Sequence, residues 1–287
     1  MKAENETPLR EPLDPAALRR AAVRPGGLWH RVEVVESTGS TNADLLARAR
    51  DGEPEGTVLV TEHQQAGRGR MGRTWITPPR AALTFSLLVR PETVPPARRG
   101  WLPLLTGVAV TEAITEVTDV PATLKWPNDV LSAQGKLAGI LAEAAGDAIV
   151  VGIGLNVSTE AAELPDRGPG ALPAASLLTA GAKPGTLGRD RLLLAILDAF
   201  ERRYLAWRAA AGDQDRSGVR AAYVARSGTI GRQVRAELPG GQALSGSAVG
   251  VDADGRLLVR PSAGTSFAGI SSAGTVPVAA ADVVHLR

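Results

Sequence analysis

A glycine- and arginine-rich segment tests whether this chain can adopt a dinucleotide-binding fold. It runs from Gly67 to Trp75 and reads GRGRMGRTW. Its glycines satisfy G-x-G-x-x-G, the fingerprint of dinucleotide-binding folds, in which a helix begins within the motif. Here Pro78 and Pro79 follow, and then a β-type run at residues 82–89. Because no helix can begin there, the dinucleotide interpretation fails.

The rest of the pattern mixes helices and strands without a regular βαβ rhythm. Apolar alternation and β-rich runs predict strands at residues 31–36, 57–62, 82–89, 137–144 and 148–155. Helical periodicity predicts helices at residues 41–50, 102–117 and 189–211. The Pro/Gly-rich stretch 165–188 is predicted to be irregular. This mixture favours an α+β fold over a doubly wound sheet.

The two ends of the chain differ from its middle. Residues 1–27 alternate charges with prolines and predict a flexible tail with one short helix near 15–23. Residues 28–225 then form the main domain. Residues 226–287 contain short β-type runs that predict a small SH3-like barrel, with a Gly/Ser-rich loop at 263–274. The expected strands of this barrel are 232–237, 243–251, 256–260, 275–279 and 283–286.

Composition excludes several kinds of chemistry. The chain has no cysteine and only three scattered histidines, so disulfides, thiolate nucleophiles and Cys-based metal sites are excluded. Thirty-two Lys and Arg against 30 Asp and Glu give a net charge of +2, which argues against polyanion binding over the whole surface. No signal-peptide core is present, and the longest apolar runs are too short to span a bilayer. We therefore expect a cytoplasmic protein without a membrane partner.

The Gly/Arg segment has two interpretations that the sequence leaves open. It is either a solvated surface loop or an anion site. Arg68, Arg70 and Arg73, separated by glycines, supply forked donors and accessible backbone N–H groups that suit a phosphate or carboxylate. Trp75 at the end of the segment can fold it down, so we expect the loop to order around a ligand.

A second candidate site follows at Lys125-Trp126-Pro127-Asn128-Asp129. Pro127 disfavours helix before it, so the segment is extended and turns at Asn128 and Asp129. A plain turn is the simpler interpretation. However, Lys125 and Lys136 are two of only four lysines in the chain, and both lie close to Asp129 in sequence. A lysine, an amide and a carboxylate together can bind a metal-complexed phosphate.

Two further segments have weaker signals. Gly135–Ile140 places Lys136 at the start of an apolar strand, and Leu137 stands where a phosphate-binding P-loop requires Ser or Thr. Ser37–Asn42 precedes a predicted helix, where Ser40 or Thr41 would serve as its N-cap. The same hydroxyl and backbone donors can bind a polar ligand head group.

Taken together and in this order, these motifs resemble those of the biotin–protein ligase family. The match spans Trp29 to Arg287 and adds the segment Gly152–Val157 and the C-terminal barrel. The resemblance implies a class II aminoacyl-tRNA-synthetase-like mixed sheet flanked by helices, plus the SH3-like domain. It implies an enzyme that makes biotinyl-5′-adenylate from biotin and ATP with Mg²⁺. Biotin is then transferred to one lysine of a biotin carboxyl carrier domain.

The resemblance also implies roles for individual residues. Those expected to bind biotin are Ser40, Thr41, Asn42, Gln64, Gly67, Arg68, Gly69, Arg70, Lys136 and Gly139. Those expected at ATP or the adenylate are Arg70, Arg73, Trp75, Asn128, Lys136 and Asn156. Lys136, Arg70 and Asp129 would act in catalysis, because fixed cations relieve the repulsion between the carboxylate and the α-phosphate. Asp129 is also the candidate for the Mg²⁺ side, or for the proton of the carrier lysine.

The chain departs from the family pattern at two points. Met71 stands where the family often has another basic residue, which lowers the charge of the loop. The sequence before Trp29 is too short for the DNA-binding domain of the bifunctional ligase–repressors, so we expect no operator binding. Two rivals remain: a lipoate–protein ligase of similar fold, and a non-catalytic RNA-binding protein that uses the Gly/Arg loop.

Overall fold

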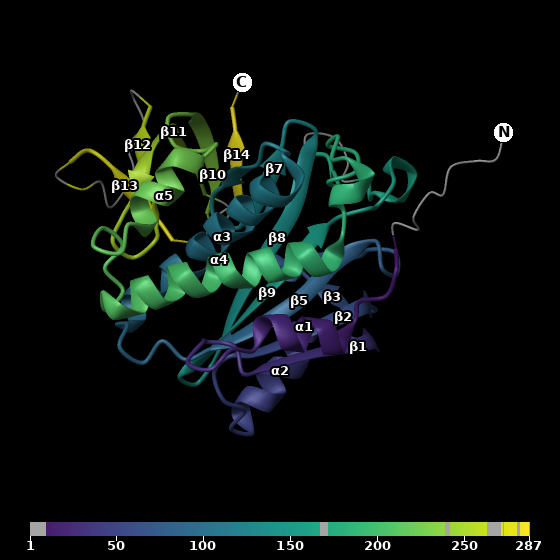
Figure 1. Cartoon of the computed structure of the whole chain (residues 1–287). Helices are drawn as coiled ribbons and strands as arrows, with labels where there is room; N and C mark the ends of the chain where they lie inside the picture. The colour runs from purple at the N-terminus through teal and green to yellow at the C-terminus, as the bar shows by residue number, and fades with distance from the viewer. Residues whose placement is uncertain are drawn as a thin grey trace.

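A computed structural model describes residues 10–166, 172–238, 242–262, 271, 273–279 and 282–286 of the chain. Its centre is a seven-stranded sheet in the order β1-β2-β5-β9-β8-β7-β6, and a five-stranded sheet in the order β13-β12-β11-β10-β14 lies beside it (Figure 1). The strands of the large sheet are β1 (Arg31–Thr38), β2 (Thr57–Gln64), β5 (Ala82–Val89), β6 (Thr123–Lys125), β7 (Asp129–Ser132), β8 (Gly135–Ala145) and β9 (Ala148–Asn156). The strands of the small sheet are β10 (Gln233–Glu237), β11 (Ala243–Val251), β12 (Leu257–Pro261), β13 (Val276–Val278) and β14 (Asp282–His285).

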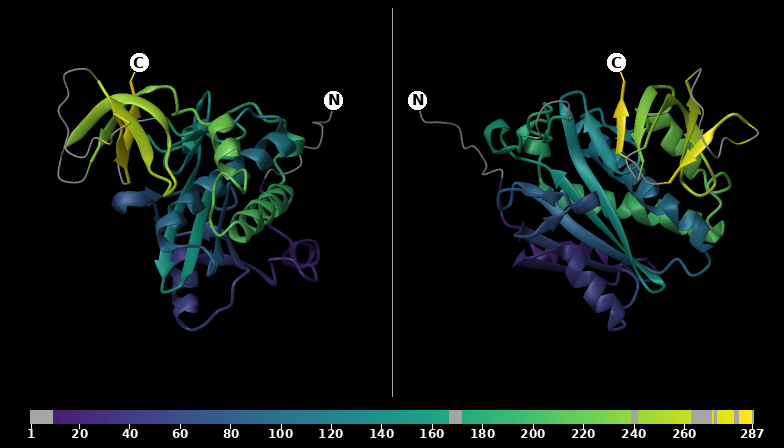
Figure 2. Two further views of the ribbon diagram at one scale, coloured as in Figure 1. Left: turned by 90° about the vertical axis from the view of Figure 1, so that its left-hand side faces the viewer. Right: turned by 180° about the vertical axis from the view of Figure 1, so that it is seen from behind.

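Five α-helices occur among the described residues, and they cover both faces of the large sheet (Figures 1 and 2). They are α1 (Pro15–Ala22), α2 (Thr41–Arg50), α3 (Trp101–Thr118), α4 (Arg189–Ala209) and α5 (Val219–Arg226). The first connection, β1-α2-β2, joins two parallel strands, and the other neighbouring strands of the large sheet are antiparallel. The prediction of a mixed α+β fold is therefore confirmed.

The alternation of side chains along the central strands creates two different faces. On β5, Phe85 and Leu87 belong to the large core that also contains the buried side chains of α3 and α4. Leu88, on the other face, belongs to a smaller core with Leu45 of α2. Further along this second face the strands carry polar or very small residues instead of apolar ones. That region is not filled by a helix, and the candidate site lies there.

The N-terminal segment corrects one prediction. Residues 1–9 lie outside the described part, but residues 10–27 are not a flexible tail. Leu13 and Leu18 are buried in the core. The Leu13 backbone N–H donates to Glu62 on β2, and Arg189 on α4 bonds both Glu62 and the Glu11 carbonyl oxygen. The sequence pattern missed this because the partners of the segment lie on β2 and α4, far along the chain.

The other expected elements are largely confirmed. All eight strands and helices predicted for the main domain occur, with boundaries that shift by no more than two residues. Strands β6 and β7 and helix α5 were not predicted, because three to eight residues carry too little periodicity. Residues 172–188 are irregular apart from a 3₁₀ turn at Pro184–Thr186, as expected. Most of the predicted loop at 263–274 lies outside the described residues.

The small sheet agrees with an SH3-like domain, and the turn between its strands β11 and β12 contacts the main domain at the start of α3 and at Trp126. Its five strands correspond to the five predicted runs and are all antiparallel. The indole N–H of Trp101 at the start of α3 donates to the Asp252 carbonyl at 3.0 Å. The indole N–H of Trp126 donates to the Gly255 carbonyl at 3.1 Å. Among the described residues, no helix combines the length and apolar character needed to cross a membrane.

Candidate active site

A pocket lies on the second face of the large sheet, beneath the Gly/Arg segment. The register aligns Thr84, Gly154 and Gly139 across strands β5, β9 and β8, and the next row on the same face is Ser86, Gly152 and Leu141. Glycine at three of these six positions leaves room over the sheet for other groups. The pocket is therefore a consequence of which residues the period-two alternation places on this face.

The Gly/Arg segment folds over this floor as a two-stranded ribbon rather than a helix. Gly67 pairs with Trp75, and the Gly69 N–H donates to the Arg73 carbonyl at 2.6 Å. The turn between them has Met71 at φ 57° and Gly72 at φ 73°, a conformation that glycine adopts readily and methionine adopts at a cost. The prediction that no helix begins here is confirmed.

The ribbon places the Trp75 indole on the row of glycines. A Cβ at Gly154 would overlap the indole ring, and one at Gly139 would lie 3.5 Å from it. The indole Nε1 is buried and has no hydrogen-bond partner among the described residues. An unsatisfied buried donor is costly, so Nε1 is a ready donor for an acceptor atom of a ligand.

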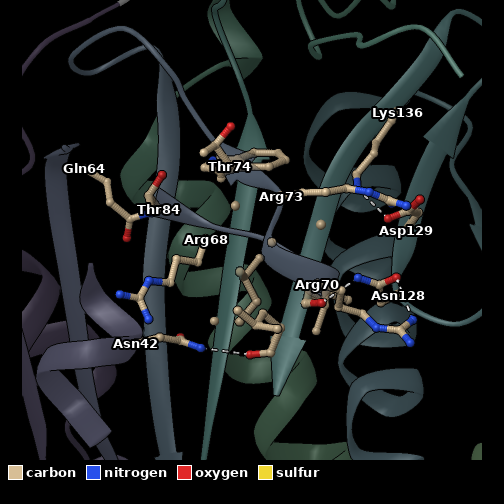
Figure 3. A pocket seen from close by; sticks show the side chains of 18 of the residues that line it. Asn42, Gln64, Arg68, Arg70, Arg73, Thr74, Thr84, Asn128, Asp129 and Lys136 are labelled. Carbon is tan, nitrogen blue, oxygen red and sulfur yellow. Dashed lines mark hydrogen bonds and ion pairs between the residues drawn. The ribbon is translucent and has the colours of Figure 1, made fainter. Parts of the chain in front are cut away.

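One end of the pocket carries amide and hydroxyl groups. The Ser40 hydroxyl caps α2 by accepting from the Ala43 N–H, as the sequence predicts. The Thr41 N–H donates to Gln64 Oε1 at 3.0 Å, and this contact fixes the orientation of the Gln64 amide. The Nε2 group of Gln64 is thereby left as the donor. Figure 3 shows Gln64, Asn42 and Arg68 together at this end.

The opposite end is charged. Lys136 Nζ lies 2.5 Å from Asp129 Oδ1, and Lys125 Nζ lies 3.9 Å from Asp129 Oδ2. Arg70 reaches Asn128 Oδ1 at 3.5 Å, and the Asn128 amide donates to the Ile140 carbonyl at 2.8 Å (Figure 3). Burial lowers the pKa of Arg70 from its ordinary value, while the Asp129 carboxylate opposes this shift.

The charged end owes its geometry to strand pairing. Strands β6 and β7 form a hairpin in which Lys125 pairs with Asp129, and a bulge between Val130 and Leu131 separates the two halves of the β7–β8 pairing. A bulge of this kind re-aims the side chains beside it. Asn156, at the end of β9, donates to the Ala175 carbonyl at 2.9 Å and closes this side.

The structure gathers nearly all of the residues selected from the sequence. Those that line the pocket are Ser40, Thr41, Asn42, Gln64, Arg68, Gly69, Arg70, Arg73, Trp75, Asn128, Asp129, Lys136, Gly139 and Asn156. Gly67 lines the adjoining groove instead. Sequence reasoning did not select Thr84, Gly152, Gly154 or Val283, which also line the pocket. The alternation along β5 and β9 carried a usable signal for the first three, whereas nothing local pointed to Val283 on the second sheet.

The residues present do not form a metal site of their own. Among the described residues, no group of three or more His, Asp and Glu side chains is arranged to hold a metal ion. Asp129 is the one carboxylate that lines the described pocket, and Lys136 occupies one of its oxygens. This donor set fits Mg²⁺ that arrives with nucleotide phosphates, since Mg²⁺ commonly takes one protein carboxylate plus phosphate oxygens and waters.

Two family models match the chain, one within the main domain and one over the C-terminal domain. The sequence model of the biotin/lipoate A/B protein ligase family matches residues 33–159, and that of the biotin protein ligase C-terminal domain matches residues 229–286. The chain is 45% identical to a biotin–[acetyl-CoA-carboxylase] ligase of Mycobacterium tuberculosis, over 97% of this chain and 98% of that one. It is 32% identical to the bifunctional ligase/repressor BirA of Bacillus subtilis, over 81% of this chain and 69% of that one.

Solved structures give the same result. The biotin protein ligase from Aquifex aeolicus in complex with biotin and ATP superposes with a TM-score of 0.68 at 25% identity, covering 90% of this chain and all of that one. The aligned region of the mycobacterial ligase covers 97% of this chain, at 45% identity. The chain therefore belongs to the biotin–protein ligase family.

Proposed function

We propose that this chain activates biotin with ATP and transfers it to a lysine of a biotin carboxyl carrier domain. One observation carries the proposal: a single pocket joins an end of oriented amide and hydroxyl groups, with Arg68 beside them, to an end that holds Lys136, Lys125 and Arg70. Biotin has the matching polarity, with a cyclic urea at one end and a carboxylate at the other. The names of the relatives support the same activity.

The first step forms the adenylate. A carboxylate oxygen of biotin attacks the α-phosphorus of Mg–ATP, the bond to the β-phosphate oxygen breaks, and pyrophosphate leaves. The biotin carboxylate and the α-phosphate are both anions and must approach one another, and negative charge builds up on the α-phosphate oxygens. We assign Lys136 and Arg70 to the stabilisation of that charge, with Asn128 and Asn156 on the nucleotide side. Asp129 holds the Lys136 ammonium in position at 2.5 Å.

The second step transfers the acyl group. The neutral amine of the carrier lysine attacks the acyl carbon, the bond to the phosphate oxygen breaks, and AMP leaves. The amine must lose a proton, and we assign Asp129 as its acceptor. The mixed anhydride is labile to water, and the ribbon that contains Arg73 and Trp75 covers the pocket, so we assign these residues to its protection.

The chemistry of acetyl-CoA carboxylase makes its carrier domain the expected partner, as the name of the mycobacterial relative indicates for that protein. We assign the reaction to residues 28–225, supported by residues 226–287, and expect it to occur in the cytoplasm. Operator binding is no part of the proposed function, and residues 10–27 contain one short helix that packs on the domain.

A lipoate–protein ligase is the second candidate, because the family model that matches residues 33–159 includes both activities. The oriented amide donor at Gln64 favours biotin, since the dithiolane ring of lipoate has no carbonyl to accept from it. The test is the intact mass of a biotin carboxyl carrier domain after incubation with this protein, ATP and Mg²⁺, with biotin or lipoate in parallel. A biotin-sized increment that requires ATP supports the proposal. A lipoate-sized increment overturns the choice of substrate, and salt-dependent RNA binding without any increment overturns the activity itself.

A further inference from the structure

Beneath the end of the pocket that carries Thr41 and Gln64 lies a chain of hydrogen-bonded polar groups that starts outside the pocket. Asn42 Nδ2 donates to the Leu141 carbonyl at 3.1 Å and to Glu143 Oε2 at 2.7 Å. Both partners can only accept, so the orientation of the Asn42 amide is unambiguous. Its two N–H bonds are fully used by the protein. Glu143 itself lines the adjoining groove rather than the described pocket.

The position of Asn42 is fixed by the floor of the sheet. Its side chain lies over Gly152, where a Cβ would overlap it. Gly152 pairs with Ser86 on β5 and with Leu141 on β8, so the amide spans three neighbouring strands. Movement of this amide would break its hydrogen bonds to Leu141 on β8 and to Ser86 on β5.

The hydrogens along this chain can be assigned one after another. Ser86 Oγ lies 2.6 Å from Asn42 Oδ1 and 2.7 Å from Thr41 Oγ1. A serine hydroxyl has one hydrogen, and the Asn42 carbonyl oxygen has none to offer in return. The Ser86 hydrogen therefore lies toward Asn42, and the Thr41 hydroxyl supplies the hydrogen of the second contact. This leaves the lone pairs of Thr41 Oγ1 as acceptors at the pocket surface.

The same assignment defines the neighbouring group. The Thr41 hydroxyl hydrogen is committed to Ser86, so Gln64 Oε1 takes its hydrogen bond from the Thr41 backbone N–H at 3.0 Å rather than from the hydroxyl at 3.3 Å. The Gln64 amide then presents its Nε2 donor. Thr41 Oγ1 as an acceptor and Gln64 Nε2 as a donor, side by side, match a ligand N–H next to a C=O, as in a cyclic urea.

We infer that Glu143 and Ser86, neither of which lines the described pocket, are positioning residues that make Thr41 an acceptor and so select ligands with an N–H beside a carbonyl. This inference rests on the proposed function and deepens it. Glu143 acts through Asn42 and Ser86, whereas Ser86 contacts Thr41 directly at 2.7 Å and is fully buried beneath the site. Removal of either side chain should change the relative affinity for biotin and its carbamate analogues and leave the rate of adenylate formation unchanged.

The test compares Ser86→Ala with Thr106→Val, which removes an equally buried hydroxyl from α3. Ligands are biotin and the two cyclic carbamates in which one ureido N–H is replaced by oxygen. We expect the biotin Kd, measured calorimetrically, to rise about five- to tenfold in Ser86→Ala, the effect of one lost hydrogen bond. One of the two carbamates lacks the N–H that would donate to Thr41, and its Kd should change less than twofold. The kcat for pyrophosphate release at saturating biotin should also change less than twofold. Thr106→Val should retain the wild-type discrimination.

Glu143 gives an independent test if Ser86→Ala fails to fold. Glu143→Gln keeps an acceptor for Asn42 and should retain wild-type discrimination, whereas Glu143→Leu should lose it. The double variant Ser86→Ala/Glu143→Leu should lose no more than the larger single change, because both act through one chain of bonds. An equal loss of affinity for biotin and both carbamates would indicate a structural role and overturn the inference. Failure of the wild-type protein to form an adenylate would instead overturn the proposed function.

Discussion

The buried ion pair behind the pocket predicts a large loss of stability from one substitution. Arg189 and Glu62 have side chains only 3% exposed and lie 2.5 Å apart. Arg189→Met would leave the Glu62 carboxylate buried, with the Leu13 N–H as its remaining donor. Removal of one partner of such a pair costs about 3–5 kcal/mol, a large part of the roughly 5–15 kcal/mol that stabilises a typical domain. It would also free the Glu11 carbonyl and release residues 10–27.

The assay is urea unfolding followed by tryptophan fluorescence, together with limited proteolysis of residues 10–27. The control is Arg235→Met, which removes an arginine whose side chain is 54% exposed and whose Nε lies 3.8 Å from Glu237, itself 58% exposed. Exposed pairs contribute about 0–1 kcal/mol, so the control should barely move the midpoint. The double variant Glu62→Gln/Arg189→Met should recover part of the loss, because no charge stays buried. If Arg189→Met is no more costly than Arg235→Met, the reasoning about this ion pair is wrong.

Three further predictions concern the site and its support. Lys136→Ala should lower biotin-dependent pyrophosphate release about 10²- to 10³-fold with an unchanged circular dichroism spectrum, and near-wild-type release would contradict its assignment. Arg70→Gly should loosen retention of the adenylate, seen by mass spectrometry as labelling of lysines outside the carrier domain, whereas labelling confined to the carrier would count against Arg70 as a phosphate contact. Burial, with smaller effects from Lys125 and Arg232, lowers the pKa of His285 to about 4. Because the unfolded chain then binds more protons, stability should fall as pH drops from about 6.5 to about 4. His285→Gln should flatten that part of the stability profile, and an unchanged slope would refute the assignment.

Elements defined by interactions within their own segment were predicted correctly, whereas those held by residues far along the chain were not. Helix α2 and strand β5 occur with the predicted boundaries, because a cap, a period and a terminator all lie within the segment itself. The absence of a helix in the Gly/Arg segment was predicted from the prolines that follow it, whereas its two-stranded pairing was not predicted. The short helix expected near 15–23 occurs as α1, but the flexibility expected of residues 10–27 was wrong, because contacts with β2 and α4 hold the segment in place.

The candidate site shows the same limit. The sequence selected Lys136, Asp129 and Arg70 by residue type and spacing, and these three do meet at one end of the pocket. It did not select Ser86 or Glu143, because nothing in a serine within an apolar strand, or in a glutamate near a strand end, indicates a ligand. Their importance arises only when β5 and β8 lie on either side of Gly152.

The sequence by itself determined the chemistry available to this protein. The absence of cysteine excludes thiol chemistry, and the glycine-spaced arginines supply donors that suit an anion, because those properties belong to the residues wherever they lie. Only the tertiary structure decided the geometry. Strand register brings Asn42, Ser86 and Glu143 into one hydrogen-bonded chain, and the hairpin of β6 and β7 sets Asp129 between two lysines. Pairing between strands far apart in sequence depends on contacts that no local pattern encodes, and the selectivity of the pocket depends on that pairing.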